Sequence, residues 1–313
     1  MDLDMAQVRA FVHTADELHF GRAASSLAIS QQALSKRIAR LETLLGTALF
    51  ERGRNGARLT EAGHRFLAPA RQTLTAADAA VAAALGKDRP LRVDVWGHLY
   101  GPMRTMAQLA GPTGDLVLGH GRDLPSVTAA LLNGEIDAAF GRVHPPLPSG
   151  LTHRLVRLEP VDAVLNAGHP LADEPSLTPH QLADSVLLTP GALDRLDFLR
   201  QFTDHFGIRN RATSVNLGLT HFLEALADTP DGFTLLPADL HLPTLPNAPT
   251  PRSVPLLNPT PLYAWSLLWR TGDGHPGLTT LTAACAAQAA RNRWLEYTPS
   301  HDWLPGDAFD GQE

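Results

Sequence analysis

The 313-residue sequence predicts a multidomain protein with a helix-rich head, one long linker helix and a two-lobed, doubly wound α/β domain. Three observations support this fold class. Short helical patterns and a basic turn fill the first 60 residues, one apolar stripe runs through 61–86, and strand and helix patterns alternate from residue 91. The polar segment Gly86-Lys87-Asp88-Arg89-Pro90 separates the last two parts as a hinge.

The head contains a helix-turn-helix pattern. One helix is predicted over about 2–18, and a second over 21–27 ends at a turn formed by 28–29. Ser30 stands at the N-cap position of a third helix, whose apolar face is marked by Leu34, Ile38, Leu41 and Leu45. Amides that read base edges and cations that hold phosphates suit a helix in the DNA major groove. The predicted DNA-binding residues of this helix are Ser30, Gln31, Gln32, Ser35, Lys36 and Arg40.

A basic hairpin follows the third helix. Residues 49–52 and 57–60 flank the turn Gly53-Arg54-Asn55-Gly56, and Asn-Gly is a strong signal for a two-residue hairpin loop. Arg52, Arg54 and Arg58 would let this hairpin reach the phosphates or the minor groove beside the recognition helix. An ordinary helical hairpin with a solvated polar face is the alternative for the helix pair alone. With the wing, residues 1–60 predict a winged helix-turn-helix DNA-binding domain.

The segment RAASSLAISQQALSKRIARLETLLGTALFERGRNGARLTEAGHRFL resembles the N-terminal signature of LysR-type transcriptional regulators. The similarity runs without gaps from about Met1 to Arg71, with one departure: Gln32 replaces the proline usual in the family. The resemblance implies a regulator that binds double-stranded promoter DNA as a homo-oligomer, either a dimer or a tetramer, and that is not an enzyme. It also implies a small-molecule effector, whose identity the sequence does not specify.

The apolar stripe of 61–86 predicts one long helix that needs a partner for its exposed face. Packing on the chain's own second domain is one possibility, and the resemblance favours a dimerising linker formed by 61–89. Pro69 lies inside the pattern, so a kink or local break is expected near residue 65.

The remaining chain predicts an effector-binding domain over 90–295, followed by a loose, irregular tail over 296–313. Lobe 1 would comprise about 90–157 and 260–295, and lobe 2 about 158–259. Strands are predicted at 91–95, 115–118, 136–140, 161–165, 186–188, 213–215, 233–236 and 262–269, with an edge strand near Val254. Helices are predicted at 101–110, 124–132, 196–206, 220–227 and 277–293. Two lobes joined by two crossovers are typical of periplasmic-binding-protein-like domains, and 169–172 (HPLA) and 232–237 (GFTLLP) resemble LysR effector domains.

Ligands of open α/β sheets bind beyond the carboxyl ends of the strands. This rule predicts an effector site formed by the residues that follow the strands: Gly97, His98, Leu99, Tyr100, Arg122, Asp123, Arg142, Gly191, Asn216, Leu217 and Phe233. Arg142 is a candidate anchor for a carboxylate, with a surface cation as the equal alternative. Trp96 is predicted to belong to the core of lobe 1.

Composition limits the possible functions. The net charge is −6, but residues 1–72 hold ten Lys and Arg against seven Asp and Glu, so the head is basic on an acidic body. The single cysteine, Cys285, is predicted to be buried in a helix. Catalytic motifs and metal-ligand spacings are missing, so no cofactor or metal is expected. Without an apolar run of about 18 residues or a secretory segment, we expect a cytoplasmic protein without a membrane partner.

Two rival functions stay open at this stage. One is an enzyme or metabolite-binding protein whose DNA-binding head is vestigial. The other is a DNA-binding regulator that responds to no small effector.

Overall fold

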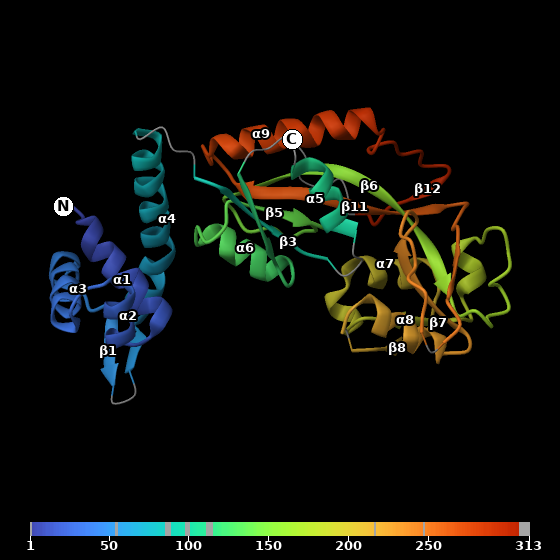
Figure 1. Cartoon of the computed structure of the whole chain (residues 1–313), viewed down its shortest axis with the longest axis horizontal. Coiled ribbons are helices and arrows are strands. Elements are labelled where there is room, and N and C mark those ends of the chain that lie inside the picture. Colours follow the sequence, from blue (N-terminus) through green and yellow to red (C-terminus); the bar gives the residue numbers. More distant parts are fainter. Residues whose placement is uncertain are drawn as a thin grey trace. The chain divides into compact units, whose positions relative to one another are not determined.

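The computed structural model describes residues 2–53, 56–84, 89–97, 101–110, 115–215, 217–246 and 248–306 (Figure 1). The chain forms two compact units. One comprises Met1–Leu91 and Thr128–Asp137, and the other comprises Arg92–Val127 and Ala138–Glu313. The domain boundaries expected from the sequence remain a prediction. None of the helices in the described ranges is long and apolar enough to cross a membrane.

The head has the helix order that the sequence predicts. Its elements are α1 (Met5–Glu17), α2 (Phe20–Ser26), α3 (Gln31–Leu45), the antiparallel strands β1 (Phe50–Gly53) and β2 (Gly56–Leu59), and α4 (Glu61–Ala84). The Ser30 hydroxyl accepts a hydrogen bond from the Ala33 N–H at 3.1 Å, which confirms the predicted N-cap of α3. Gly46 ends α3 in the left-handed conformation, with φ +68°.

The head core is formed by side chains at the predicted helical spacing. Leu34, Ile38 and Leu41 of α3 are fully buried together with Phe11 of α1. The ring of Phe11 lies 5.3 Å from that of Phe50, so the wing packs on the same core as the helices. The recognition helix is therefore held by its apolar face, which leaves the opposite face outside the core.

The junction between α3, the wing and α4 is closed by hydrogen bonds. Glu42 of α3 accepts from the Leu49 and Phe50 N–H groups with Oε1, at 2.7 and 3.2 Å. The Thr60 hydroxyl accepts from the Gly63 N–H at 3.0 Å. A Cβ atom on Gly63 would lie 2.3 Å from the Leu49 carbonyl oxygen, so only glycine lets α4 start this close to the wing.

Helix α4 runs unbroken from Glu61 to Ala84 with Pro69 inside it. Of the two predicted outcomes near residue 65, the local break is therefore wrong, and the kink stays a prediction. Proline removes one backbone hydrogen bond and costs about 3 kcal/mol in a helix interior. Burial of Ala70 and Leu74 against the head core, on the turn that follows Pro69, offsets this cost.

The effector-domain part of the chain contains a mixed sheet in the order β4-β3-β5-β11-β6-β9-β7-β8. One half, here called lobe 1, contains β3 (Leu91–Val95), β4 (Leu116–His120), β5 (Ala138–Gly141) and β11 (Thr260–Arg270), with α5 (Gly101–Ala110), α6 (Leu124–Leu132) and α9 (Pro276–Arg291). The other half, lobe 2, contains β7 (Val186–Thr189), β8 (Asn210–Thr213), β9 (Gly232–Pro237) and β10 (Arg252–Val254), with η1 (Pro179–Leu182), η2 (Leu193–Arg195), α7 (Asp197–Phe206) and α8 (Leu219–Ala227).

Strand β6 (Leu151–Leu165) joins the two lobes as one continuous element. The sequence predicts a separate strand at 161–165, but this segment is the second half of β6, and the chain changes pairing partner without leaving the extended conformation. Leu151–Pro160 pairs with β11, and Val161–Leu165 pairs with β9. Pro160 lies where the partner changes, which is a position where a missing N–H is tolerated in a sheet. Strand β11 is antiparallel to β5 and β6, and β6 is antiparallel to β9, so the sheet is not purely parallel.

The segment after α9 differs from the loose tail that the sequence predicts. β12 (Asp302–Trp303) pairs in parallel with Thr260 and Pro261 of β11, and Trp303 and Leu304 are buried. Trp303 lies among aromatic rings of α7, which gives this irregular segment the apolar contacts that its sequence period does not reveal.

Candidate functional site

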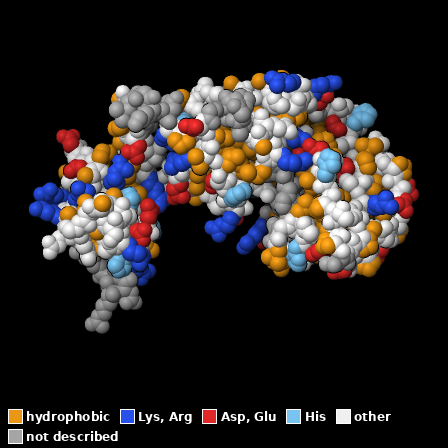
Figure 2. Space-filling view, viewed as in Figure 1, with side chains coloured by type: hydrophobic (Ala, Val, Ile, Leu, Met, Phe, Trp, Pro, Cys, Tyr) orange, Lys and Arg blue, Asp and Glu red, His pale blue; other side chains and the backbone are white. Residues whose placement is uncertain are grey.

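The polar face of α3 forms the first candidate site. Gln31, Gln32, Lys36 and Arg40 are exposed, and Ser35 is half-buried. Figure 2 shows Lys and Arg side chains gathered over α3 on the head. The amides lie at the N-terminal end of the helix and the cations follow, which is the order that places amides near base edges and cations near phosphates.

The wing, formed by β1 and β2, follows α3 directly in the sequence. Arg58 is exposed on β2, directly across the hairpin from Glu51. Arg54 and the side chain of Arg52 lie outside the described residues, so their predicted phosphate contacts stay predictions.

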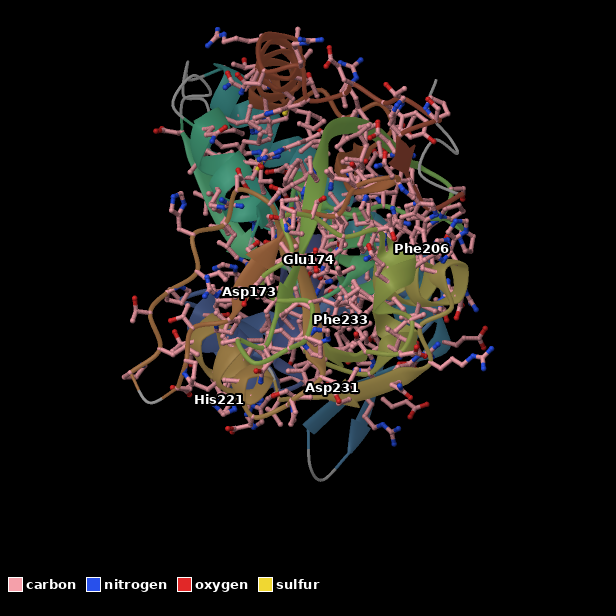
Figure 3. The ribbon with its side chains drawn as sticks, turned by 90° about the vertical axis from the view of Figure 1, so that its right-hand side faces the viewer. Asp173, Glu174, Phe206, His221, Asp231 and Phe233 are labelled. Carbon is pink, nitrogen blue, oxygen red and sulfur yellow. The ribbon has the colours of Figure 1, made fainter. Side chains whose placement is uncertain are left out.

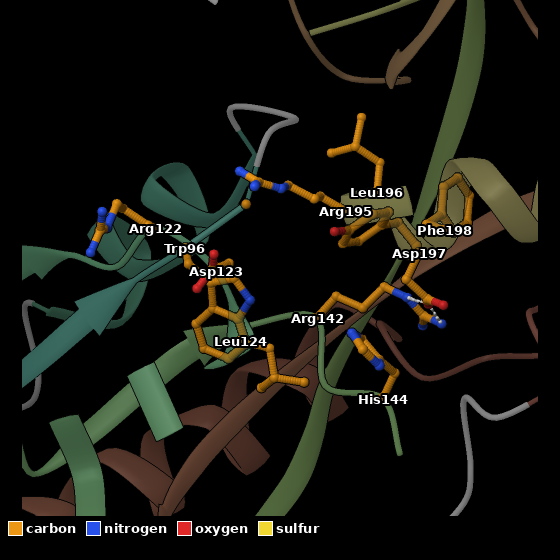
Figure 4. Close-up of a pocket in the computed structure, with 12 residues that line it drawn as sticks. Trp96, Arg122, Asp123, Leu124, Arg142, His144, Arg195, Leu196, Asp197 and Phe198 are labelled. Carbon is orange, nitrogen blue, oxygen red and sulfur yellow. Dashed lines mark hydrogen bonds and ion pairs between the residues drawn. The ribbon is translucent and has the colours of Figure 1, made fainter. Parts of the chain in front are cut away.

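A pocket of about 170 Å³ forms the second candidate site, between lobe 1 and lobe 2 (Figure 4). Its lobe 1 wall is made by the residues that follow β3, β4 and β5, and its lobe 2 wall by the start of α7. Tyr263 of β11 completes it. The lining residues are Trp96, Gly97, Arg122, Asp123, Leu124, Arg142, His144, Arg195, Leu196, Asp197, Phe198 and Tyr263.

Arg142 and Asp197 form an ion pair across the pocket. Arg142 follows β5 in lobe 1, and its Nε and Nη2 atoms donate to Asp197 Oδ2 at 3.0 and 2.6 Å. Asp197 is the first residue of α7 in lobe 2 and also accepts from the Gln201 side chain at 3.0 Å. Burial alone would raise the pKa of Asp197, but the Arg142 charge and these hydrogen bonds outweigh it and lower the pKa.

Aromatic side chains form the apolar part of the pocket. Trp96 is only 6% exposed and packs over Gly141, where a Cβ atom would lie 2.2 Å from the indole ring. Trp96 therefore belongs to the lobe 1 core, as predicted, and also borders the pocket. The Tyr263 ring lies 4.8 Å from the Phe198 ring, and burial raises the pKa of its hydroxyl.

A buried charge network lies next to Tyr263. Glu159 of β6 is the register partner of Tyr263 and accepts from Trp265 Nε1 at 2.6 Å. Arg157 lies 3.1 Å from Glu159 and 3.2 Å from Asp239, which follows β9 in lobe 2. Burial raises the pKa of Glu159 despite the neighbouring Arg157 charge. The network provides a second set of charge contacts between the strands of lobe 1 and lobe 2.

The structure brings together four of the predicted effector residues, because Gly97, Arg122, Asp123 and Arg142 all line the pocket. His98, Leu99, Tyr100 and Asn216 lie outside the described residues. Gly191 and Leu217 do not line this pocket, and Leu217 is 69% exposed. Phe233 is fully buried in β9, inside lobe 2, as Figure 3 shows. The effector role of each of these residues stays a prediction.

Sequence reasoning missed Arg195, Asp197 and Tyr263 as pocket residues. The residues expected after β7 were 190–192, but the short helix η2 follows them and leads to the start of α7, where the pocket residues lie. The predicted helix start at Leu196 was the available signal, because helix N-termini face ligands in such sheets. Tyr263 carried no signal, since it lies in a strand that is buried on both faces.

One histidine and one serine lie within hydrogen-bonding distance in the interior of lobe 2. His169 Nε2 lies 3.0 Å from the Ser185 hydroxyl, and both residues are buried in lobe 2. The Nδ1 atom of His169 accepts a hydrogen bond from the Leu171 N–H, so in the neutral ring the proton is on Nε2. Nε2 therefore donates to Ser185 and cannot act as its base. In the described ranges, no group of three or more His, Cys, Asp or Glu is arranged to hold a metal ion.

A DNA-reading head joined to a two-lobed α/β domain with an interlobe pocket defines a class of DNA-binding proteins with a ligand-sensing domain. Residues 5–64 match the family model of the bacterial regulatory helix-turn-helix protein, lysR family, and residues 122–290 match that of the LysR substrate binding domain. The chain belongs to the LysR family of DNA-binding transcriptional regulators.

Known proteins of this kind resemble the chain in sequence and fold. The uncharacterized HTH-type transcriptional regulator YnfL of Escherichia coli K12 is 35% identical over 195 residues, which are 58% of this chain and 64% of YnfL. The match thus spans less than two thirds of that relative. A full-length OxyR variant from Pseudomonas aeruginosa has a TM-score of 0.70 at 24% identity, over 91% of this chain and 95% of that chain.

Full-length CbnR in complex with its target DNA has a TM-score of 0.61 at 22% identity. The similarity covers 92% of this chain and 100% of that chain. These two structures show that the chain shares their fold, and the two family models assign it to the transcriptional regulators.

Proposed function

We propose that this protein binds a promoter through the polar face of α3 and that a small molecule in the interlobe pocket modulates this binding. The observation that carries the proposal is the exposed row of Gln31, Gln32, Lys36 and Arg40 on a helix held by a well-packed head. The basic surplus of the head is small, so we propose that tight binding needs two or more heads joined in a homo-oligomer.

The charges of the pocket favour an anionic effector. Asp197 is already paired with Arg142, and Asp123 accepts from the Ser126 N–H at 2.9 Å as part of the α6 start. Arg122 and Arg195 make no ion pair within 4.0 Å in the described ranges. The pKa of Asp123 is lowered first by its hydrogen bonds with Ser126 and then by the charges of these two arginines. In Figure 4 the Arg195 side chain extends from lobe 2 toward lobe 1, whereas Arg122 is turned away. We therefore propose a small anion that Arg195 holds against lobe 1.

Gel-shift titration against the protein's own upstream region tests the DNA-binding proposal. We expect Gln31→Ala to relax sequence preference, because an amide that reads a base edge is lost. Lys36→Ala should weaken binding to all sequences and lower the salt slope by about one, because one phosphate contact is lost. Glu61→Gln, on an exposed residue at the start of α4, is the control. A wild-type protein with no sequence preference at any salt concentration would refute the proposal.

A thermal-shift screen with small mono- and dianions tests the effector proposal. An anion at 100 times its dissociation constant stabilises the folded protein by about 2.7 kcal/mol. Arg195→Ala should remove this stabilisation, and Arg211→Ala, on the same lobe, 43% exposed and outside the pocket lining, should keep it. Equal stabilisation of both variants would argue against an Arg195 contact.

A further inference from the structure

The C-terminal segment 294–304, here called the strap, extends from lobe 1 to lobe 2. It begins after α9, where the Trp294 carbonyl accepts from the Leu158 N–H at 2.8 Å and the Trp294 ring lies 5.1 Å from the Arg157 guanidinium. It ends with Trp303 and Leu304, and the Trp303 ring lies against α7 in lobe 2. Residues 291–313 lie beyond the part of the chain that matches the LysR substrate binding domain.

The adjacent strap residues Trp303 and Leu304 pack against different elements. Leu304 joins an apolar cluster with Leu155, Leu158 and Leu262 of the central strands β6 and β11. Trp303 packs instead on α7, with ring centroids 5.7 Å from Phe198, 5.8 Å from Phe202 and 5.3 Å from Phe206. Such aromatic contacts contribute beyond the area that they bury. The strap is therefore fixed on the central strands and on α7 at the same time.

The backbone of the strap is also held in place. The His301 carbonyl accepts from the Thr260 N–H at 2.7 Å, next to the pairing of β12 with β11. Asp302 Oδ2 accepts from the Thr298 N–H at 2.7 Å and closes the turn before Trp303. Trp303 is thus presented to α7 by a segment with a defined conformation.

Helix α7 contributes pocket residues at its start. Phe198, which Trp303 contacts, lines the pocket and packs on Tyr263, and the preceding residue Asp197 forms the ion pair with Arg142. Trp303 therefore contacts a pocket residue, Phe198, directly, and through Phe198 it is connected to Tyr263. We propose that Trp303 is a positioning residue for the effector pocket: it holds the start of α7 so that Asp197 meets Arg142 across the lobes. This inference deepens the proposed effector site and rests on that proposed function.

A double-mutant cycle measured by denaturant unfolding of the full-length protein tests the coupling. In the wild-type background we expect Asp197→Asn to raise the unfolding equilibrium constant about a hundredfold. In Trp303→Ala the same change should raise it tenfold or less, because Asp197 no longer meets Arg142 in the same geometry. Trp303→Phe should restore the wild-type sensitivity, since it keeps a ring against Phe198. Leu295→Ala, on an exposed strap residue, is the matched control.

Hydrogen exchange gives a second readout that needs no mutation of the ion pair. Amides of 196–200 should exchange at least tenfold faster in Trp303→Ala than in wild type, and amides of α3 should be unchanged. If Trp303→Ala does not fold, Trp303→Leu takes its place in both experiments. An equal effect of Asp197→Asn in all backgrounds, or unchanged exchange at 196–200, overturns the proposal. Neither readout involves DNA or an effector, so failure of the proposed function is detected separately by the gel shift and the anion screen.

Discussion

The Arg142 guanidinium donates two hydrogen bonds to one oxygen of Asp197, and the two residues come from different lobes. Of the two interpretations that the sequence allows for Arg142, the surface cation is wrong, because Arg142 is buried against Asp197; a role as anchor for a ligand carboxylate stays a prediction. Arg142 is only 3% exposed, so this buried ion pair couples the position of α7 to the end of β5. The relative position of the lobes at the pocket thus depends on this charge contact.

We expect Asp197→Asn to lower the free energy of unfolding by about 2–4 kcal/mol at pH 7, because removing one partner of a buried ion pair leaves the other poorly compensated. The pKa of Asp197 is lowered in the folded protein, so its stabilising contribution is complete above the unfolded pKa and is lost as pH falls through the folded pKa. The gap between wild type and variant should therefore shrink below about pH 4.

Urea unfolding between pH 3 and pH 7 measures this gap. Arg200→Ala is the control, because Arg200 is 48% exposed and its contact with Asp197 contributes less than about 1 kcal/mol. A gap that does not change with pH would contradict the assigned pKa direction.

Glu159 should show the opposite pH dependence. Its pKa is raised by burial, so its contribution to stability is complete below the unfolded pKa and decreases as pH rises through the folded pKa. We expect the free energy of unfolding of wild type minus that of Glu159→Gln to fall between about pH 4.5 and pH 7. Glutamine keeps an oxygen for the Trp265 N–H, which limits other losses.

The same unfolding series, run on Glu159→Gln and on Glu174→Gln, checks this expectation. Glu174 is exposed in lobe 2 and is not part of the buried charge network around Glu159. A difference that rises with pH would mean that the neighbouring arginines outweigh burial in setting the pKa of Glu159.

Cys285 should be inert in the folded protein. The side chain is 1% exposed in α9, and burial raises the pKa of its thiol to about 12. At pH 8 the thiolate, which is the reactive form, should be at least about 1,000-fold rarer than in the unfolded chain. Iodoacetamide labelling followed by mass spectrometry should be slow in buffer and fast in guanidinium chloride; rapid labelling in buffer would show that α9 opens locally.

Gly63→Ala should destabilise the head although alanine favours helices. The new Cβ would lie 2.3 Å from the Leu49 carbonyl and 2.9 Å from a Leu59 methyl group, and the backbone atom has little room to move. We expect a loss of about 1–3 kcal/mol, which exceeds the gain in helix propensity of about 1 kcal/mol. Gly191→Ala is the control, because nothing lies within 4 Å of its Cβ position. Thermal unfolding followed by circular dichroism compares the two variants.

The sequence predicts the head more completely than the pocket, for physical reasons. Contacts within the head are local, so the N-cap at Ser30 and the apolar spacing of α3 determine the helix with little help from distant residues. The pocket joins residues far apart in the chain, such as Arg142 and Asp197, and no local pattern links them. Trp303 shows the same limit: its burial depends on the rings of α7, about a hundred residues earlier.

Glu42, Thr60 and Gly63 together join the recognition helix, the wing and the start of α4 through backbone contacts with little room for movement. These contacts hold the recognition helix, the wing and the start of α4 in fixed positions relative to one another. A rotation of the start of α4 is therefore expected to carry the polar face of α3 with it. In the homo-oligomer proposed above, the distance between two DNA-binding heads would then change without any rearrangement inside either head.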